Sequence, residues 1–493
     1  MAVPLSKDLL RAEFVGKTLH EVITPAAVLD LAKVEVNCNL MLEAAQRLQL
    51  SWRAHIKTHK TEELTRLQVG DASSSPVNLI VSTILEAERV VPLLQEYRDK
   101  GRQINVLYSF PLYPSSTPRL AAISKQLGPR AVTVMVDHVD QVAYLDTLTT
   151  ESGGIAPLVF LKVNVGSDRA GVVPGTSTCT SLITALLASE AAGASELLGV
   201  YSHAGHSYAT REDWEAMGIL GAEFEGLKEV AEEVQREQKK AHVQNPSHTT
   251  HRPLVLSVGA TPTATTIQHP DLDPSSSAPS HSEPTPNPNP NTNAAAQTTH
   301  LKSLLHTLST QNLTPEVHAG VYPTLDLQQL AAHARSAPYL HSGLIALSVL
   351  ADIASVYPLR GPSGETEALV NAGSLALGRE PCQEMVGGEQ YRGWGIVMPW
   401  GELAAEKVPV PGEGFPREHG GWEVAKISQE HGVLRWVGGA DDEVPVRVGQ
   451  RVRIWPNHSC ITGAGHGWYL VVDSRNTGRE DEIVDVWPRW NGW

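Results

Sequence analysis

The sequence predicts an α/β protein made of a (β/α)8 barrel and a smaller C-terminal antiparallel β domain. Three observations lead to this fold class. Eight short apolar runs follow one another along the chain, amphipathic stretches separate most of them, and tryptophan-rich alternating segments begin after about residue 380. Continuous apolar strands that alternate with helices indicate a parallel sheet covered by helices, and eight such units suggest a closed barrel. A doubly wound open sheet shares this alternation and remains the structural alternative.

The eight expected strands are short and apolar, as strands buried on both faces should be. They cover residues 54–59, 77–83, 104–110, 131–137, 157–166, 196–204, 253–259 and 315–321. Residues 84–100 and 211–237 are examples of the amphipathic helical stretches between them. We expect an N-terminal segment (1–20) that packs with the β domain, a barrel over 21–380 and a β domain over 381–493.

One segment inside the barrel region has a different composition. Residues 264–300 contain almost no aliphatic side chains, and prolines alternate with polar residues between Pro284 and Pro290. Such a stretch buries too little apolar surface to offset the entropy of ordering it. We therefore expect a disordered, low-complexity insertion over 264–300.

Charge and cysteine content limit the possible partners and compartment. The chain has 493 residues, with 39 Lys and Arg against 54 Asp and Glu, for a net charge of −15. No basic stripe stands out, which argues against nucleic acid as the main partner. No apolar run approaches the roughly 18 residues of a membrane span, and the first residues lack the apolar core of a signal peptide. The four scattered cysteines do not form a disulfide framework, so we expect a cytoplasmic protein.

A lysine pair at the end of the first expected strand is the first candidate for chemistry. Lys57 and Lys60 lie in RAHIKTHKT, where the reactive groups of a barrel would be found. Burial lowers the cost of the neutral amine that a nucleophile needs. The alternative is that both lysines are surface charges beyond the strand.

Residues after the later strands could hold an anionic cofactor. Gly259, Ala260 and Thr261 follow the seventh strand, where barrels often bind phosphate through backbone N–H groups. Arg169 follows the fifth strand and could contact an oxyanion. The sixth strand is followed by rings that could line a cofactor, namely Tyr201, His203 and Tyr208. A turn of small residues and a polar loop are the structural alternatives.

A His-x-Cys pair near the C-terminus is a candidate metal site. His458 and Cys460 lie in WPNHSCIT. On a strand, positions i and i+2 face the same side, so an imidazole and a thiolate could converge there. These donors suit Zn²⁺ better than Mg²⁺ or Ca²⁺, although a buried cysteine beside a packed histidine is a common alternative.

Taken together, these segments resemble the fold-type III pyridoxal-phosphate enzymes, the alanine-racemase-like barrel family. Within it they are most similar to the eukaryotic D-serine dehydratase family, from FVGKTLHEVITPAAVLDLAKVEVNC through RAHIKTHKT, VNVGSDRAGV, GVYSHAGHSY, SVGATPT and EVHAGVYP to VGQRVRIWPNHSCIT. The resemblance implies that Lys57, rather than Lys60, attaches pyridoxal 5'-phosphate. It also implies a phosphate cradle at Gly259, Ala260 and Thr261, and Zn²⁺ ligands at His458 and Cys460.

The resemblance implies a homodimeric lyase that converts a D-amino acid, D-serine, to pyruvate and ammonia, with possible action on D-threonine. Three alternatives stay open. A D-threonine aldolase would share the barrel and the lysine, but its metal pair is His-x-Asp. A racemase would need a second base and no metal. A pyridoxal-phosphate carrier without turnover would resemble a lone barrel, without the C-terminal domain.

Overall fold

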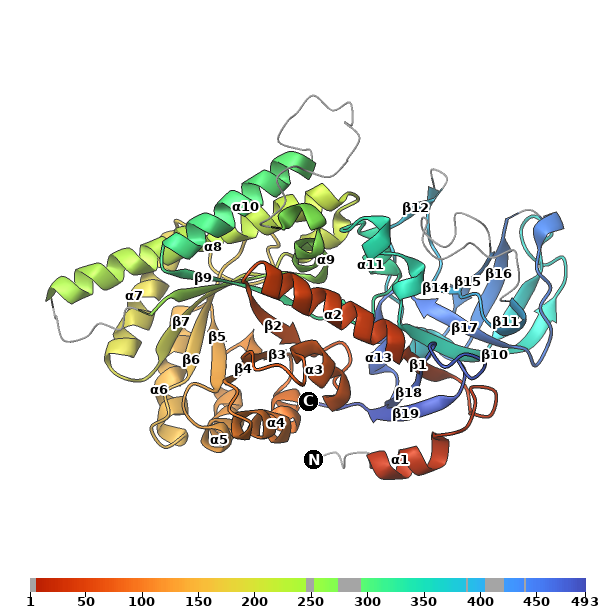
Figure 1. Cartoon of the computed structure of the whole chain (residues 1–493), viewed down its shortest axis with the longest axis horizontal. Helices are drawn as coiled ribbons and strands as arrows, with labels where there is room; N and C mark the ends of the chain where they lie inside the picture. Colours follow the sequence, from red (N-terminus) through yellow and green to blue (C-terminus); the bar gives the residue numbers. More distant parts are fainter. Residues whose placement is uncertain (1–5, 245–251, 274–293, 387–388, 404–420, 439) are drawn as a thin grey trace. The chain divides into compact units, whose positions relative to one another are not determined.

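The computed structural model describes residues 6–244, 252–273, 294–386, 389–403, 421–438 and 440–493. The chain divides into two compact units. The barrel unit comprises residues 41–57 and 68–320 together with Trp493, and the sheet unit comprises residues 1–40, 58–67 and 321–492. Figure 1 shows the elements of both units along the chain.

The barrel unit contains the closed parallel barrel that the sequence predicts. Its eight strands are β2 (Ser51–His55), β3 (Val77–Val81), β4 (Ile104–Pro111), β5 (Val132–Val136), β6 (Leu158–Lys162), β7 (Glu196–Tyr201), β8 (Leu254–Val258) and β9 (Leu313–Ala319). Each strand pairs in parallel with the next, and β9 pairs with β2 to close the barrel. Strands β5 and β6 are buried at every position, which explains their continuous apolar sequence.

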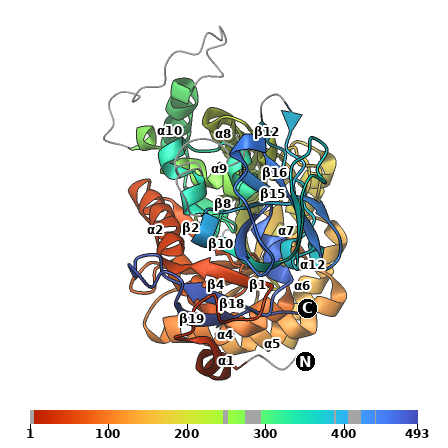
Figure 2. The same ribbon diagram turned by 90° about the vertical axis from the view of Figure 1, so that its right-hand side faces the viewer.

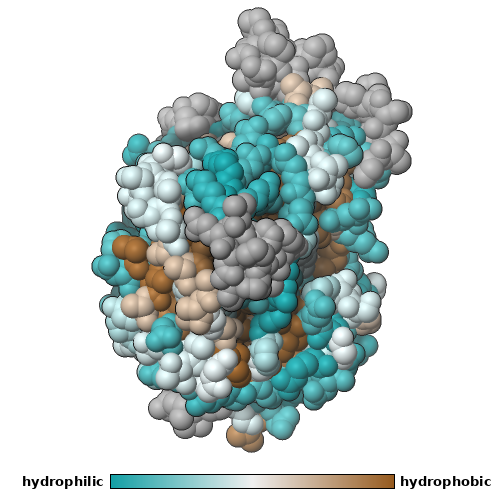
Figure 3. Space-filling model, turned by 90° about the vertical axis from the view of Figure 1, so that its left-hand side faces the viewer, coloured by the Kyte–Doolittle hydropathy of each residue, from teal (hydrophilic) through white to brown (hydrophobic). Residues whose placement is uncertain are grey.

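Helices lie around the outside of these strands (Figure 1). The described ones include α4 (Ile84–Asp99), α5 (Thr117–Leu127), α6 (Val142–Glu151), α7 (Ser177–Ala191), α8 (Asp213–Gln244) and α10 (Ala294–Thr310). Helix α4 begins with a capping box between Thr83 and Glu86, which satisfies orphan N–H groups at its start. In the view of Figure 3, hydrophilic residues cover most of the described surface, and hydrophobic residues form smaller separate areas.

The predicted insertion over 264–300 is wrong at both of its ends. Helix α9 (Thr261–Thr265) and two short 3-10 turns continue the chain to residue 272, with Ile267 and Leu272 fully buried. Helix α10 begins at Ala294 and buries Leu301. A few well-spaced aliphatic residues are enough to anchor these stretches. The prediction was wrong there because it considered the aliphatic content of the segment as a whole and not the positions of single residues. Residues 274–293 lie outside the described part of the chain.

The sheet unit is built on nine strands in the order β11-β16-β15-β14-β17-β10-β1-β18-β19, with β10 also pairing with β11. They are β1 (Ala26–Asp30), β10 (Leu347–Tyr357), β11 (Glu367–Val370), β14 (Gly395–Val397), β15 (Gly421–Ile427), β16 (Gly432–Val437), β17 (Arg451–Pro456), β18 (Trp468–Val472) and β19 (Ile483–Pro488). All pairings are antiparallel except β1 with β18. Figure 2 shows several of these strands from the side.

The sheet unit uses residues on both sides of the barrel sequence. Strands β10 and β11 precede the domain boundary that we expected at residue 381, and β1 precedes the first barrel strand. None of these three strands is among the eight that the sequence predicted. Helix α2 (Leu31–Arg47) follows β1 directly. Helix α3 (Glu62–Val69) follows β2.

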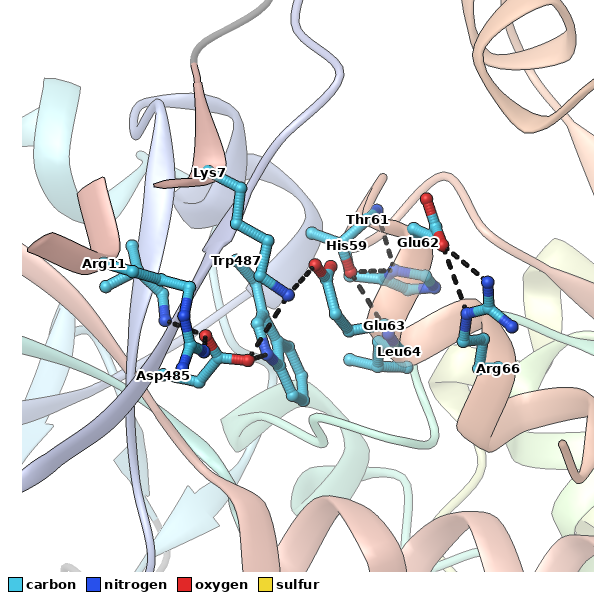
Figure 4. Close-up of polar contacts among 11 residues, drawn as sticks. Lys7, Arg11, His59, Thr61, Glu62, Glu63, Leu64, Arg66, Asp485 and Trp487 are labelled. Atoms are coloured by element: carbon cyan, nitrogen blue, oxygen red, sulfur yellow. Dashed lines mark hydrogen bonds and ion pairs between the residues drawn. The ribbon is translucent and has the colours of Figure 1, made fainter. Parts of the chain in front are cut away.

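The N-terminal helix α1 (Lys7–Phe14) lies beside β19, as Figures 1 and 2 both show. Figure 4 shows the polar contacts that accompany this packing. Lys7 forms ion pairs with Glu63 at 2.6 Å and with Asp485 at 3.4 Å, and Arg11 pairs with Asp485. Further along the chain, Leu19 is fully buried in an apolar cluster with residues of β18 and β19.

The structure gives one further result on membrane topology. Within the residues that it describes, no helix combines the length and the hydrophobicity that a membrane crossing requires.

Candidate active site

Lys57 follows the first barrel strand, two residues after the end of β2. It is half-buried, and its backbone N–H lies 3.5 Å from Nδ1 of His55. The positive charge of Lys57 helps to lower the pKa of His203, so the two side chains share one electrostatic environment. Lys60 belongs to the sheet unit, where its carbonyl accepts a hydrogen bond from Trp490. Of these two lysines, only Lys57 therefore belongs to the barrel unit.

A stack of rings lies inside the barrel unit between strands β7 and β9. The rings of Tyr201 and His318 are nearly parallel, with centroids 4.3 Å apart and an angle of 8°. Nδ1 of His318 lies 3.0 Å from Oγ of Ser257. Nε2 of His318 is buried and has no hydrogen-bond partner among the described residues. Because burial places the pKa of His318 well below its usual value, the ring is neutral and leaves Nε2 for a ligand.

His203 connects this stack to the loop after β8. Its Nδ1 lies 2.8 Å from the carbonyl oxygen of Gly259, so Nδ1 donates the hydrogen bond. Burial lowers the pKa of His203 well below 6.5, and the charges of Lys162, Lys57 and Arg169 lower it further. The histidine is therefore neutral, with its proton on Nδ1.

The turn at Gly259 is tightly built. Gly259 has φ of +140°, and a Cβ at this position would lie 2.3 Å from the carbonyl oxygen of His318, so no other residue fits without a shift of the backbone. Its N–H donates to Oε1 of Glu223 at 3.3 Å, and the N–H of Ala260 donates to Oγ1 of Thr263 at 3.0 Å. Two of the N–H groups that we expected to bind phosphate thus donate within the protein. Thr261 is buried at the start of α9.

Two cations lie near these rings. Nζ of Lys162, the last residue of β6, lies 4.5 Å from the centroid of the Tyr201 ring. Burial lowers the pKa of Lys162 to about 7, and the nearby charge of Arg169 acts in the same direction. Arg169 itself is exposed and also acts electrostatically on Tyr201 and His203. Tyr208 lies in the 3-10 segment after β7 and is half-buried.

Three residues of this site were missing from the sequence prediction. Lys162 ends an otherwise apolar strand, and His318 lies in the buried half of β9, so a polar residue inside a buried strand was a usable signal. Glu223 lies on the buried stripe of α8 between Leu220 and Leu227, where a carboxylate needs a partner. The identity of that partner could not be read from the sequence.

His458 and Cys460 lie in the sheet unit, but the prediction that they share a strand is wrong. Strand β17 ends at Pro456, His458 is the N-cap of helix α13 (Ser459–Ala464), and Cys460 is in that helix. The side chains still hydrogen-bond to each other. Burial opposes the charged form of His458, but Cys460 and Asp326 raise its pKa to about 11.

The surroundings of this pair are polar and buried. Asp326 is fully buried, lies 3.3 Å from Nδ1 of His458 and accepts a hydrogen bond from the N–H of Ser459 at 2.9 Å. Sγ of Cys460 lies 3.1 Å from Oγ1 of Thr58. In the part of the chain that the structure describes, no group of three or more His, Cys, Asp or Glu side chains has the arrangement of a metal site. The pair offers one imidazole and one sulfur donor.

Both units resemble known families. Residues 29–273 match the family model "Alanine racemase, N-terminal domain", and residues 346–472 match "Putative serine dehydratase domain". The chain is 34% identical to D-serine dehydratase of Schizosaccharomyces pombe, over 99% of this chain and 96% of the relative. It is 30% identical to D-serine dehydratase of Saccharomyces cerevisiae, over 98% of this chain and 99% of the relative.

A solved structure has a similar fold over the full length. The D-threo-3-hydroxyaspartate dehydratase of Delftia sp. HT23 is 24% identical, with a TM-score of 0.68 over 97% of this chain and 100% of that one. A mutant of D-threo-3-hydroxyaspartate dehydratase with alanine in place of a cysteine, solved in the metal-free form, is 25% identical with the same TM-score.

Proposed function

The chain belongs to the D-serine dehydratase family of pyridoxal-phosphate-dependent lyases, and we propose that it converts D-serine to pyruvate and ammonia with pyridoxal 5'-phosphate and Zn²⁺. The observation that carries this proposal is the 34% identity over 99% of the chain. Similarity of that extent includes the unit that holds Lys57 and the unit that holds His458 and Cys460. Action on D-threonine as a second substrate is part of the proposal.

The residues of the barrel unit fit pyridoxal phosphate. Lys57 offers an amine at the end of a barrel strand, and the absence of a Cβ at Gly259 lets the turn after β8 pack closely against His318 of β9. Nε2 of His318 is a buried neutral nitrogen without a protein partner. Arg169 and Lys162 provide positive charge for an anionic group. We propose that Tyr201, His203 and Tyr208 line the cofactor and that Gly259, Ala260 and Thr261 border its phosphate.

The donors of the sheet unit fit a zinc ion. An imidazole and a thiolate are ligands that Zn²⁺ accepts readily, and two protein ligands leave positions for water or substrate, as in a catalytic site. One solved structure of the related D-threo-3-hydroxyaspartate dehydratase is a metal-free form in which alanine replaces a cysteine, and this supports a cysteine ligand. We propose His458 and Cys460 as the ligands here.

The chemistry that the chain must perform is removal of the α-proton and loss of the β-hydroxyl. When bound, pyridoxal phosphate supplies an electron sink for the carbanion, and Zn²⁺ supplies a Lewis acid for the leaving oxygen. Nζ of Lys57 is the proposed base that takes the α-proton. Burial keeps the rings of His203 and His318 neutral, so both are available to contact an uncharged part of a ligand.

The alternatives make different products. A D-threonine aldolase would release glycine, and Cys460 favours a softer metal than that enzyme's His-x-Asp pair would. A racemase would give L-serine and leave Cys460 without a role. A non-catalytic carrier would not need the sheet unit. We would incubate the purified protein with D-serine, D-threonine and L-serine and assay pyruvate, 2-oxobutanoate, ammonia and glycine. Absence of pyruvate from D-serine would refute the proposed activity.

We also propose that the protein is a cytoplasmic homodimer. All four cysteines are free, which agrees with a reducing compartment. The dimer follows from the family resemblance, in which one barrel and the partner's β domain share a site. Sedimentation at decreasing concentration, with activity measured in parallel, tests this, since a fully active monomer would exclude a shared site.

A further inference from the structure

Glu223 supports the turn after β8 from the side of helix α8. Its Oε1 accepts hydrogen bonds from Oγ of Ser202 at 2.8 Å and from the N–H of Gly259 at 3.3 Å. Its Oε2 accepts one from Oγ1 of Thr263 at 3.1 Å. Oγ1 of Thr263 in turn accepts from the N–H of Ala260. One carboxyl group therefore fixes both ends of the turn.

This carboxyl group is isolated from water. Only 1% of Glu223 is exposed, and no ion pair joins it to a described residue. Burial raises the pKa of Glu223 to about 7, although hydrogen bonds from Ser202, Gly259 and Thr263 and the charge of Lys162 lower it. The other titratable group that Glu223 faces is Tyr201, whose pKa it helps to raise. Glu223 can therefore gain or lose a proton near neutral pH.

We propose that Glu223 is a positioning residue for the cofactor phosphate: it holds the Gly259–Thr263 turn in shape and takes up a proton when phosphate binds there. This inference rests on the proposed assignment of the turn to the phosphate. Glu223 acts through the turn rather than by touching the ligand, since its oxygens are directed to Gly259, Ser202 and Thr263.

The electrostatic reason is simple. An ionised carboxylate behind an anion-binding turn repels the phosphate, and the low dielectric of a buried site strengthens that repulsion. Protonation removes it without loss of the turn, because a neutral carboxyl group can donate to Oγ1 of Thr263 while the hydroxyl of Thr263 donates to the carbonyl of Ala260, 3.3 Å away. A glutamine at position 223 can form the same set of hydrogen bonds.

The test uses full-length protein freed of cofactor and two probes, pyridoxine 5'-phosphate and pyridoxine. Neither has an aldehyde, so neither can react with Lys57, and the ratio of their dissociation constants isolates the contribution of the phosphate. The variants are Glu223→Gln, Glu223→Ala and, as a matched control, Glu225→Gln. Glu225 is an exposed carboxylate on the same helix. Urea unfolding of each variant reports its folding separately.

We expect the wild type and Glu225→Gln to prefer the phosphorylated probe, with a preference that falls about tenfold from about pH 6.5 to about pH 8.5 for one linked proton. Glu223→Gln should keep the low-pH preference and lose its pH dependence. Glu223→Ala should also lose the pH dependence, and its preference should be about tenfold below that of the wild type at about pH 6.5, because the Gly259–Thr263 turn loses the group that holds it. Lys162 also titrates near neutral pH. If Glu223→Gln keeps the pH dependence of the wild type, Lys162 is the cause of that dependence and the proposal is wrong.

Two other results would lead to different conclusions, one about Glu223 and one about the phosphate site. If Glu223→Ala weakens the binding of both probes by the same factor, so that the ratio is unchanged, Glu223 has only a structural role and the proposal is wrong. If the wild type itself shows no preference for the phosphorylated probe, the turn does not bind phosphate, and the assignment under the proposed function fails instead.

Discussion

The guanidinium of Arg53 and the carboxylate of Glu316 meet inside the barrel at 2.6 Å, with only 2% and 1% of the side chains exposed. Arg53 lies on the first barrel strand and Glu316 on the last, so this ion pair joins the two strands that close the barrel. Nη1 of Arg53 also donates to Oδ1 of Asn105 at 2.6 Å. The ion pair and this hydrogen bond together link β9, β2 and β4.

Breaking this pair from one side should destabilise the protein strongly. Arg53→Met leaves the carboxylate of Glu316 buried without its cation, which should cost about 3–5 kcal/mol of the free energy of unfolding. Arg53→Met combined with Glu316→Leu should recover much of that loss, because neither position then carries a buried charge. Urea unfolding of the three proteins measures both effects. A double variant that is no more stable than the single one would contradict this account.

Removing the amine of Lys57 should abolish covalent attachment of the cofactor. We expect Lys57→Ala to lack the visible absorbance band that attached pyridoxal phosphate gives and to lose activity by at least about a thousandfold. Lys60→Ala is the matched control, since Lys60 lies three positions further on and belongs to the other unit. Persistence of the band in Lys57→Ala, or its loss only in Lys60→Ala, would refute the assignment.

Burial of Lys162 should make stability depend on pH above neutrality. Its pKa is lowered from 10.5 to about 7, so between these values the unfolded chain binds more protons than the folded one. Stability should therefore rise with pH in this window, by up to about 1.4 kcal/mol per pH unit from this one group. Lys162→Met keeps most of the side-chain volume and should flatten the rise. Parallel curves for both proteins, from urea unfolding at several pH values, would show that Lys162 is not the cause.

Chelation should stop the proposed elimination without unfolding the sheet unit. With two protein ligands, the metal at His458 and Cys460 would be catalytic rather than structural, because structural zinc sites usually have four protein ligands. Cys460→Asp should lower pyruvate formation and shift the metal preference toward Mn²⁺, since a carboxylate is a harder donor than a thiolate. Circular dichroism before and after chelation checks folding. Undiminished pyruvate formation by verified metal-free protein would refute the zinc assignment.

The boundaries of the insertion can be tested by two deletions. Replacing residues 274–293 with a short Gly/Ser linker should leave folding and most activity intact, because the cost of loop closure depends weakly on length. Replacing all of 264–300 removes the buried Ile267 and Leu272 and the first turns of α10, and it should cost about 2–5 kcal/mol for each large buried side chain lost. Thermal unfolding compares the two proteins, and equal stability would contradict the buried role of these residues.

The sequence by itself determined the barrel, because each buried parallel strand leaves a continuous apolar run that needs no knowledge of its neighbours. It also determined the position of Lys57 at the end of a barrel strand, since that follows from chain order alone. The match to the alanine racemase N-terminal domain over residues 29–273 agrees with the barrel. These features depend on local periodicity, which is recorded within a few consecutive residues.

Only the tertiary structure decided which polar groups meet. Glu223 and Gly259 are 36 positions apart, and their hydrogen bond depends on how α8 packs against the barrel. The orphan Nε2 of His318 depends on what surrounds it, and His458 reaches Cys460 across a strand end and a helix start rather than along one strand. Such contacts depend on long-range packing and on where helices begin. The local sequence does not specify which polar groups these features bring together.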